Sequence, residues 1–208
     1  MLIFKITEIF QKPDRTLMKV ISYMVPVAML LLSFLYNNNP FIVKEEGQQA
    51  FQLINTIRSN PENYYKELQL NSKLRITHKP LRWNDTLARV AEAKAMDMAK
   101  RNYFGHVTPE GYGINHFINQ SGYTLNGEWL KANNLNYFES IGSGHNSAVE
   151  AIKSLIIDEE DTNKGHRNHL LGVSKWDASL YDIGIGFVKS DGSTYQSYIC
   201  IVIAKHNW

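Results

Sequence analysis

A run of seventeen residues without charge, 20–36 (VISYMVPVAMLLLSFLY), divides the chain into two parts of different character. Lys19 precedes the run and three asparagines follow it. A helix of this length spans about 25 Å, which is less than the roughly 30 Å hydrocarbon core of a membrane. A basic residue, an apolar run and a polar exit are typical of an export signal or an uncleaved signal anchor. We therefore expect residues 1–40 to be a targeting segment, with Met18 as a candidate true start.

The sequence does not decide whether this segment is cleaved or retained. No small-residue cleavage pattern precedes Asn37, so cleavage and retention are both compatible with it. A buried core helix is the alternative interpretation. The export reading predicts an extracellular or cell-envelope protein, which contacts the membrane only through the uncleaved segment.

Residues 41–208 have the features of a single domain, because no repeat or linker interrupts them. They carry 18 basic and 18 acidic residues, so the net charge of +2 belongs to the targeting segment. A domain without a basic field is not expected to bind nucleic acid. The single cysteine, Cys200, excludes an internal disulfide and a cluster of thiolate zinc ligands.

Hydrophobic periodicity predicts helices first and strands last. Helical spacing is found over residues 51–57, 85–101 and 148–156. Strand patterns are found over residues 137–141, 183–188 and 195–204. This order predicts an α+β fold, namely a three-layer α-β-α sandwich with a small antiparallel sheet flanked by helices.

Two histidines and two carboxylates are the candidate functional residues. His106 and His166 each follow a glycine in a polar context. Glu139 lies inside an apolar strand segment, where a charge is costly unless it has a partner. Asp158 continues the buried stripe of the helix over 148–156 and begins a run of four acids. The helix dipole disfavours acids at this end, and an imidazolium or a metal ion nearby would relieve the strain.

Such a set of side chains can do one of three things. It can bind zinc or another divalent cation, exchange protons as acid and base, or form a buried polar network that only stabilises the fold. Their long-range spacing does not decide among these. Cys200 lies in an apolar strand and is predicted to be a buried hydrophobe. The remaining histidines are expected on the surface or in loops: His78, His116, His145, His169 and His206.

Several motifs, in order over residues 46–204, resemble the CAP superfamily (cysteine-rich secretory proteins, antigen 5 and pathogenesis-related 1) in its bacterial branch. They are Leu81-Arg82-Trp83-Asn84, Tyr103-Phe104-Gly105-His106, Phe138-Glu139-Ser140-Ile141, Gly165-His166-Arg167-Asn168-His169-Leu170 and Ile183-Gly184-Ile185-Gly186. The resemblance implies an α-β-α sandwich that is normally secreted. It also implies a cleft lined by His106, Glu139, Asp158 and His166, which binds zinc in some members.

The chain departs from the family pattern at several points, among them Leu155, where the family usually has tryptophan, and a terminal strand without the family's T-Q pair. Ser140 and His169 each stand where an asparagine is expected, Asp158 replaces a glutamate, and the disulfides of eukaryotic members are absent. The insertion 127–136, with a Trp129 that looks exposed, is expected to shape the cleft rim.

The sequence therefore predicts an exported binding module whose cleft takes a divalent metal or a polar group of a partner. No motif of a dedicated nucleophile or of nucleotide binding is found, so enzymatic activity is undecided and a non-catalytic role is favoured. The alternatives are a zinc-dependent hydrolase and a module that binds lipid or sterol. The partner is expected to be an extracellular protein or a lipid ligand.

Overall fold

The computed structural model describes residues 18–19, 22–26 and 39–206. The chain divides after Asn38 into two units. In the first unit, the described residues 18–19 and 22–26 are helical, and the rest of the predicted targeting segment lies outside the described residues. Within the described ranges, no helix has the length and apolar character needed to cross a membrane.

The second unit is built on a five-stranded sheet. Its strands are β1 (Phe41–Ile42), β2 (Arg82–Trp83), β3 (Glu139–Ser143), β4 (Asp182–Lys189) and β5 (Ser197–Ala204). The order is β1-β4-β5-β3 with antiparallel pairing, and the short β2 pairs with β4 in parallel. The predicted hairpin thus forms the centre of the sheet and β3 lies at one edge. The two-residue strands β1 and β2 were not predicted.

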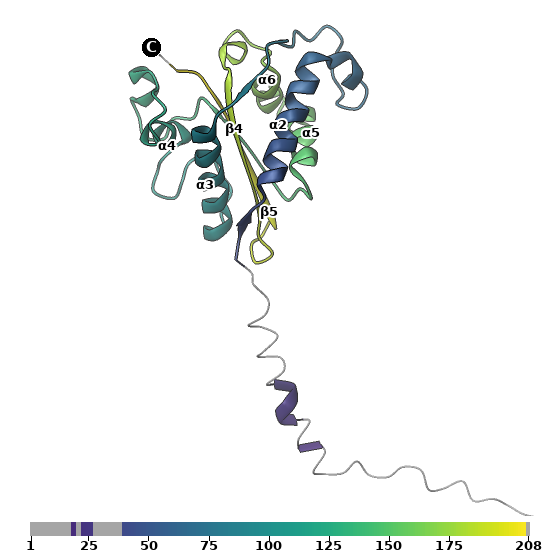
Figure 1. Cartoon of the computed structure of the whole chain (residues 1–208), viewed down its shortest axis with the longest axis vertical. Coiled ribbons are helices and arrows are strands. Elements are labelled where there is room, and N and C mark those ends of the chain that lie inside the picture. Colours follow the sequence, from purple (N-terminus) through teal and green to yellow (C-terminus); the bar gives the residue numbers. More distant parts are fainter. Residues whose placement is uncertain (1–17, 20–21, 27–38, 207–208) are drawn as a thin grey trace, which may run out of the picture. The chain divides into compact units, whose positions relative to one another are not determined.

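Helices cover both faces of this sheet, which confirms the predicted α-β-α sandwich. They are α2 (Lys44–Ser59), α3 (Asp85–Arg101), α4 (Ile114–Gln120), α5 (Ala148–Ile157) and α6 (Gly165–Leu171). Three short 3₁₀ turns occur as well: η1 (Pro61–Tyr64), η2 (Gly127–Leu130) and η3 (Asp177–Ser179). Helix α3 packs on β4 and β5, and α2, α5 and α6 pack together on the opposite side (Figure 1).

The α3 side of the sheet depends on two glycines of β4. A Cβ on Gly184 would lie 2.1 Å from the backbone nitrogen of Ala88, and one on Gly186 would lie 2.3 Å from that of Glu92. The backbone of α3 therefore lies directly against the strand, where a side chain has no room. The side chain of Asn84 caps the start of this helix, because it accepts hydrogen bonds from the main-chain amides of Thr86 and Leu87.

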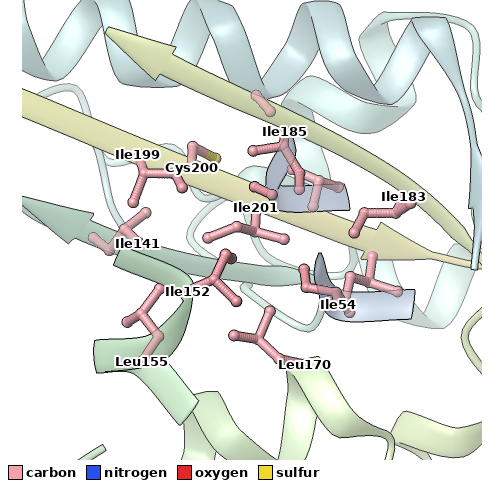
Figure 2. Packing of buried hydrophobic residues seen from close by; sticks show 14 of the residues in the cluster. Ile54, Ile141, Ile152, Leu155, Leu170, Ile183, Ile185, Ile199, Cys200 and Ile201 are labelled. Atoms are coloured by element: carbon pink, nitrogen blue, oxygen red, sulfur yellow. The ribbon is translucent and has the colours of Figure 1, made fainter. Parts of the chain in front are cut away.

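The opposite side of the sheet carries the apolar residues that alternate with these glycines. Ile183, Ile185 and Ile201 pack in one cluster with residues of α2, α5 and α6 (Figure 2). The helical partners shown there are Ile54, Ile152, Leu155 and Leu170. Burial of such side chains contributes about 1.5–3 kcal/mol each. This packing fixes α5 and α6 relative to the sheet, and both helices carry candidate site residues.

Candidate functional site

The four predicted residues come from four different segments around the edge strand β3. His106 lies in the loop after α3, and Glu139 is the first residue of β3. Asp158 is the residue that ends α5, and His166 is the second residue of α6. The structure brings them together as two histidine–carboxylate pairs.

The first pair joins His106 to the sheet. The Nδ1 atom of His106 lies 2.8 Å from Oε2 of Glu139, whose side chain is fully buried, whereas the His106 side chain is 41% exposed. Asn136, which the sequence analysis missed, places its amide nitrogen 2.9 Å from the same Nδ1. Its amide oxygen accepts a hydrogen bond from the Glu139 main chain at 3.1 Å. Asn136 therefore contacts the imidazole and fixes the start of β3, and its amide nitrogen shares the surroundings of Nδ1 with the Glu139 carboxylate.

The second pair joins the end of α5 to the start of α6. Asp158 adopts a left-handed conformation (φ 51°) and its main-chain amide donates to the Ser154 carbonyl. Its Oδ1 lies 2.8 Å from Nδ1 of His166, and its Oδ2 accepts from the main-chain amides of His166 at 2.9 Å and Arg167 at 3.3 Å. The carboxylate is thus held by the unpaired amide groups that begin a helix.

These contacts explain how the acidic run at the end of α5 is tolerated. The side chain of Arg167 donates to the carbonyls of Ile156 at 2.6 Å and Ile157 at 2.7 Å. Lys164 donates to the carbonyl of Asp158 at 2.5 Å. Cations therefore cap the negative end of α5, while the Asp158 carboxylate turns toward the positive end of α6.

Two adjoining hollows open onto the pairs. One of about 300 Å³ is lined by His106, Glu139 and His166. The other, of about 950 Å³, is lined by His166 together with Asp158 and His145. Because each Nδ1 atom faces a carboxylate, Nε2 is the ring nitrogen that His106 and His166 can offer to a ligand. In the described part of the chain, no three or more His, Cys, Asp or Glu side chains form a group that could hold a metal ion.

The prediction for His169 was wrong, because this residue is buried in α6. Its Nδ1 lies 2.8 Å from the hydroxyl oxygen of Ser140. Burial, followed by the positive charge of Arg58, lowers its pKa to about 3. The two residues that depart from the family pattern, Ser140 and His169, are thus partners, a relation that the sequence alone does not display.

Other predictions near the cleft had mixed outcomes. Cys200 is fully buried, as predicted, and burial raises the pKa of its thiol. Trp129 was expected to be exposed, but it is half-buried and packs on Phe138 and Trp176. The insertion still reaches the smaller hollow through Asn136. His145 is half-buried, and burial lowers its pKa.

Comparison with known proteins gives consistent matches. Residues 51–203 match the family described as CAP, the cysteine-rich secretory protein family. The chain is 29% identical over 124 residues to YkwD, an uncharacterized protein of Bacillus subtilis (strain 168), and the match covers 58% of this chain and 40% of YkwD. The chain thus spans less than half the length of this relative.

The chain is also similar to solved structures, including the following two. An outer surface protein from Borrelia burgdorferi has a TM-score of 0.51 at 16% identity, covering 81% of this chain and 99% of that one. An extracellular protein containing a SCP domain, from Bacillus anthracis str. Ames, has a TM-score of 0.47 at 22% identity, covering 78% of this chain and 41% of that one. At 16% identity, the likeness to the outer surface protein concerns the fold alone.

Proposed function

Because the chain belongs to the CAP, or cysteine-rich secretory protein, family, we propose that it is an exported, non-catalytic binding module. Its cleft binds a divalent cation, with zinc as the first choice, through His106 and His166. The observation that carries the proposal is that both imidazoles line one hollow while each Nδ1 lies 2.8 Å from a buried carboxylate.

In this proposal the protein supplies two ligands, the Nε2 atoms of His106 and His166, together with the carboxylates that face their rings. A histidine that ligates a metal usually donates its other ring N–H to a carboxylate, which fixes the tautomer and the orientation of the ring. The carboxylates of Glu139 and Asp158 lie 2.8 Å from the Nδ1 atoms, which supports a scheme in which they orient the rings and the Nε2 atoms ligate. Zinc prefers four ligands. Water or a polar group of a partner then fills the remaining positions.

Calorimetric titration of the protein with zinc, at pH 7.5 and pH 5.5, tests this function. We expect one-to-one binding that weakens at pH 5.5, because ligation requires neutral imidazoles. His106→Ala and His166→Ala should each weaken binding, and the double variant should abolish it with unchanged circular dichroism. His78→Ala is the matched control, since His78 is exposed and lies in neither hollow. Full retention of zinc by the double variant would contradict the assignment.

The same titration separates the alternatives. A zinc hydrolase needs three protein ligands and an open position for water. If the zinc-loaded protein hydrolyses a substrate and His106→Ala loses this activity, the hydrolase alternative is favoured. A lipid module would use the hollow of about 710 Å³ that α3 and α4 line with Val90, Ala93 and Phe117. The lipid function would be favoured by two results together. The wild type would not bind zinc, and the double variant would still bind a fluorescent fatty acid.

Export is the other part of the proposal. The uncharged run over 20–36 supports it, and one structural relative is described as an outer surface protein. Mass spectrometry of the protein from its native cells should find it outside the cytoplasm, with either a new N-terminus near residues 37–41 or an intact anchor. A full-length protein found only in the cytoplasm would contradict export.

A further inference from the structure

Lys94 is a buried cation on α3 that the proposed cation site does not use. Only 4% of the residue is exposed. Its Nζ donates to the hydroxyl of Tyr103 and to the main-chain carbonyl of His106, both at 3.2 Å. No ion pair within the described ranges includes Lys94. A buried charge without a carboxylate partner is costly, so a fold retains it at a cost in stability.

The partners of Lys94 lead directly to the first pair of the site. The Tyr103 hydroxyl, which accepts from Lys94, in turn donates to Oδ2 of Asp97 at 2.6 Å. On the other side, burial raises the pKa of the Cys200 thiol, the charge of Glu139 raises it further and that of Lys94 lowers it. The Cys200 thiol itself lies 3.5 Å from Oε1 of Glu139, and the Lys94 ammonium reaches the first pair through the main-chain carbonyl of His106.

The loop around His106 is held at its main chain as well as at the imidazole ring, which contacts Glu139 and Asn136. Its neighbours Phe104 and Val107 are both exposed large side chains, and Gly105 has no side chain to pack. The imidazole itself is 41% exposed. The main-chain amide of Tyr103 donates to the Met98 carbonyl of α3 at 3.1 Å, and Arg101 of α3 pairs with Glu110 farther along the loop. The bond from Lys94 differs from these because it holds the main chain of His106 itself.

We propose that Lys94 is a positioning residue, which holds the main chain of His106 and so sets the direction in which its imidazole meets Glu139. The inference rests on the proposed function only in that the ring so positioned is a proposed zinc ligand. The orientation of the ring is a property of the metal-free protein, and it can be measured independently.

The test uses Lys94→Met, which keeps the aliphatic stem and removes the ammonium. Side-chain ¹H–¹⁵N NMR of the metal-free protein reports which ring nitrogen of His106 carries the proton. In the wild type we expect a single tautomer, with the proton on Nδ1 facing Glu139. In Lys94→Met we expect averaging between the two tautomers, together with zinc binding at least about tenfold weaker.

Val90→Ala is the matched control, because it removes buried packing one turn away on α3 without touching His106. It should lower stability and leave the His106 ring signals in place. If Lys94→Met leaves those signals as unchanged as Val90→Ala does, the positioning role is refuted. If Lys94→Met does not fold, the same comparison with the shorter Lys94→Gln decides. Failure of the wild type to bind zinc would refute the proposed function but leave the NMR comparison valid.

Discussion

Mild acid should destabilise this protein through a histidine that lies beneath the cleft. His169 is buried, and burial together with the charge of Arg58 lowers its pKa to about 3. In the unfolded chain the same imidazole has an ordinary pKa of about 6.5. The folded state therefore keeps His169 neutral over a pH range in which the unfolded state binds a proton. Stability is present above pH 6.5 and is lost as the pH falls toward 3.

The magnitude follows from the two pKa values. Between pH 7 and pH 5 the free energy of unfolding should fall by about 2 kcal/mol on account of His169 alone. This figure is set by the unfolded pKa, because the folded imidazole is neutral at pH 5 with a pKa of about 3. Domains typically have a free energy of unfolding of roughly 5–15 kcal/mol. A loss of about 2 kcal/mol is a large enough fraction of this to be measured as a shift of the unfolding midpoint.

Urea unfolding of wild type and His169→Asn at pH 7 and pH 5 measures the effect. The variant should lose about 2 kcal/mol less than the wild type over this interval, whatever its stability at pH 7. His78→Asn is the control, since this exposed histidine should leave the pH dependence unchanged. Equal pH dependence in wild type and His169→Asn would refute the reasoning, because it would mean that folding does not exclude the proton from His169.

Two further predictions concern the sheet. Gly186→Ala should lower the free energy of unfolding by about 1–3 kcal/mol, because the added Cβ would lie 2.3 Å from the α3 backbone; Gly127→Ala, with open space around it, should be nearly neutral in the same urea assay. Cys200 should not react with a thiol reagent in the native protein, because it is fully buried and burial raises its pKa. Absorbance after addition of Ellman's reagent should rise only when the protein unfolds. Rapid labelling of the native protein would contradict this prediction.

The sequence predicted the layers of the fold because each layer has its own period. The apolar stripe over 85–101 gave α3 with its observed bounds, and the alternation of isoleucine with glycine gave β4 to within a residue of either end. The strands β1 and β2 have two residues each, too few to show a period. They form because β4 offers hydrogen-bonding partners, which is a property of the tertiary structure.

Prediction of the site was limited in a similar way. His106, Glu139, Asp158 and His166 were selected by residue type and context, and the structure pairs each histidine with one carboxylate. The residues that surround them were missed, because an asparagine in a loop and a lysine on a helix are ordinary on a surface. Only the fold reveals that Asn136 touches the His106 ring and that Lys94 is buried and bonds to the His106 carbonyl.

The edge strand β3 connects the two halves of the cleft, and its register explains how. Glu139 pairs with Val202, which in turn pairs with Gly184, so Glu139 faces the α3 layer and meets His106. Ser140 is the next residue and faces the opposite layer, where it meets His169 of α6. Since neighbouring residues of a strand point to opposite faces, a slip of one residue would exchange these two side chains. A carboxylate would then face the neutral His169, and His106 would lose its partner. The pairing of β3 with β5 is therefore as necessary to the site as the histidines themselves.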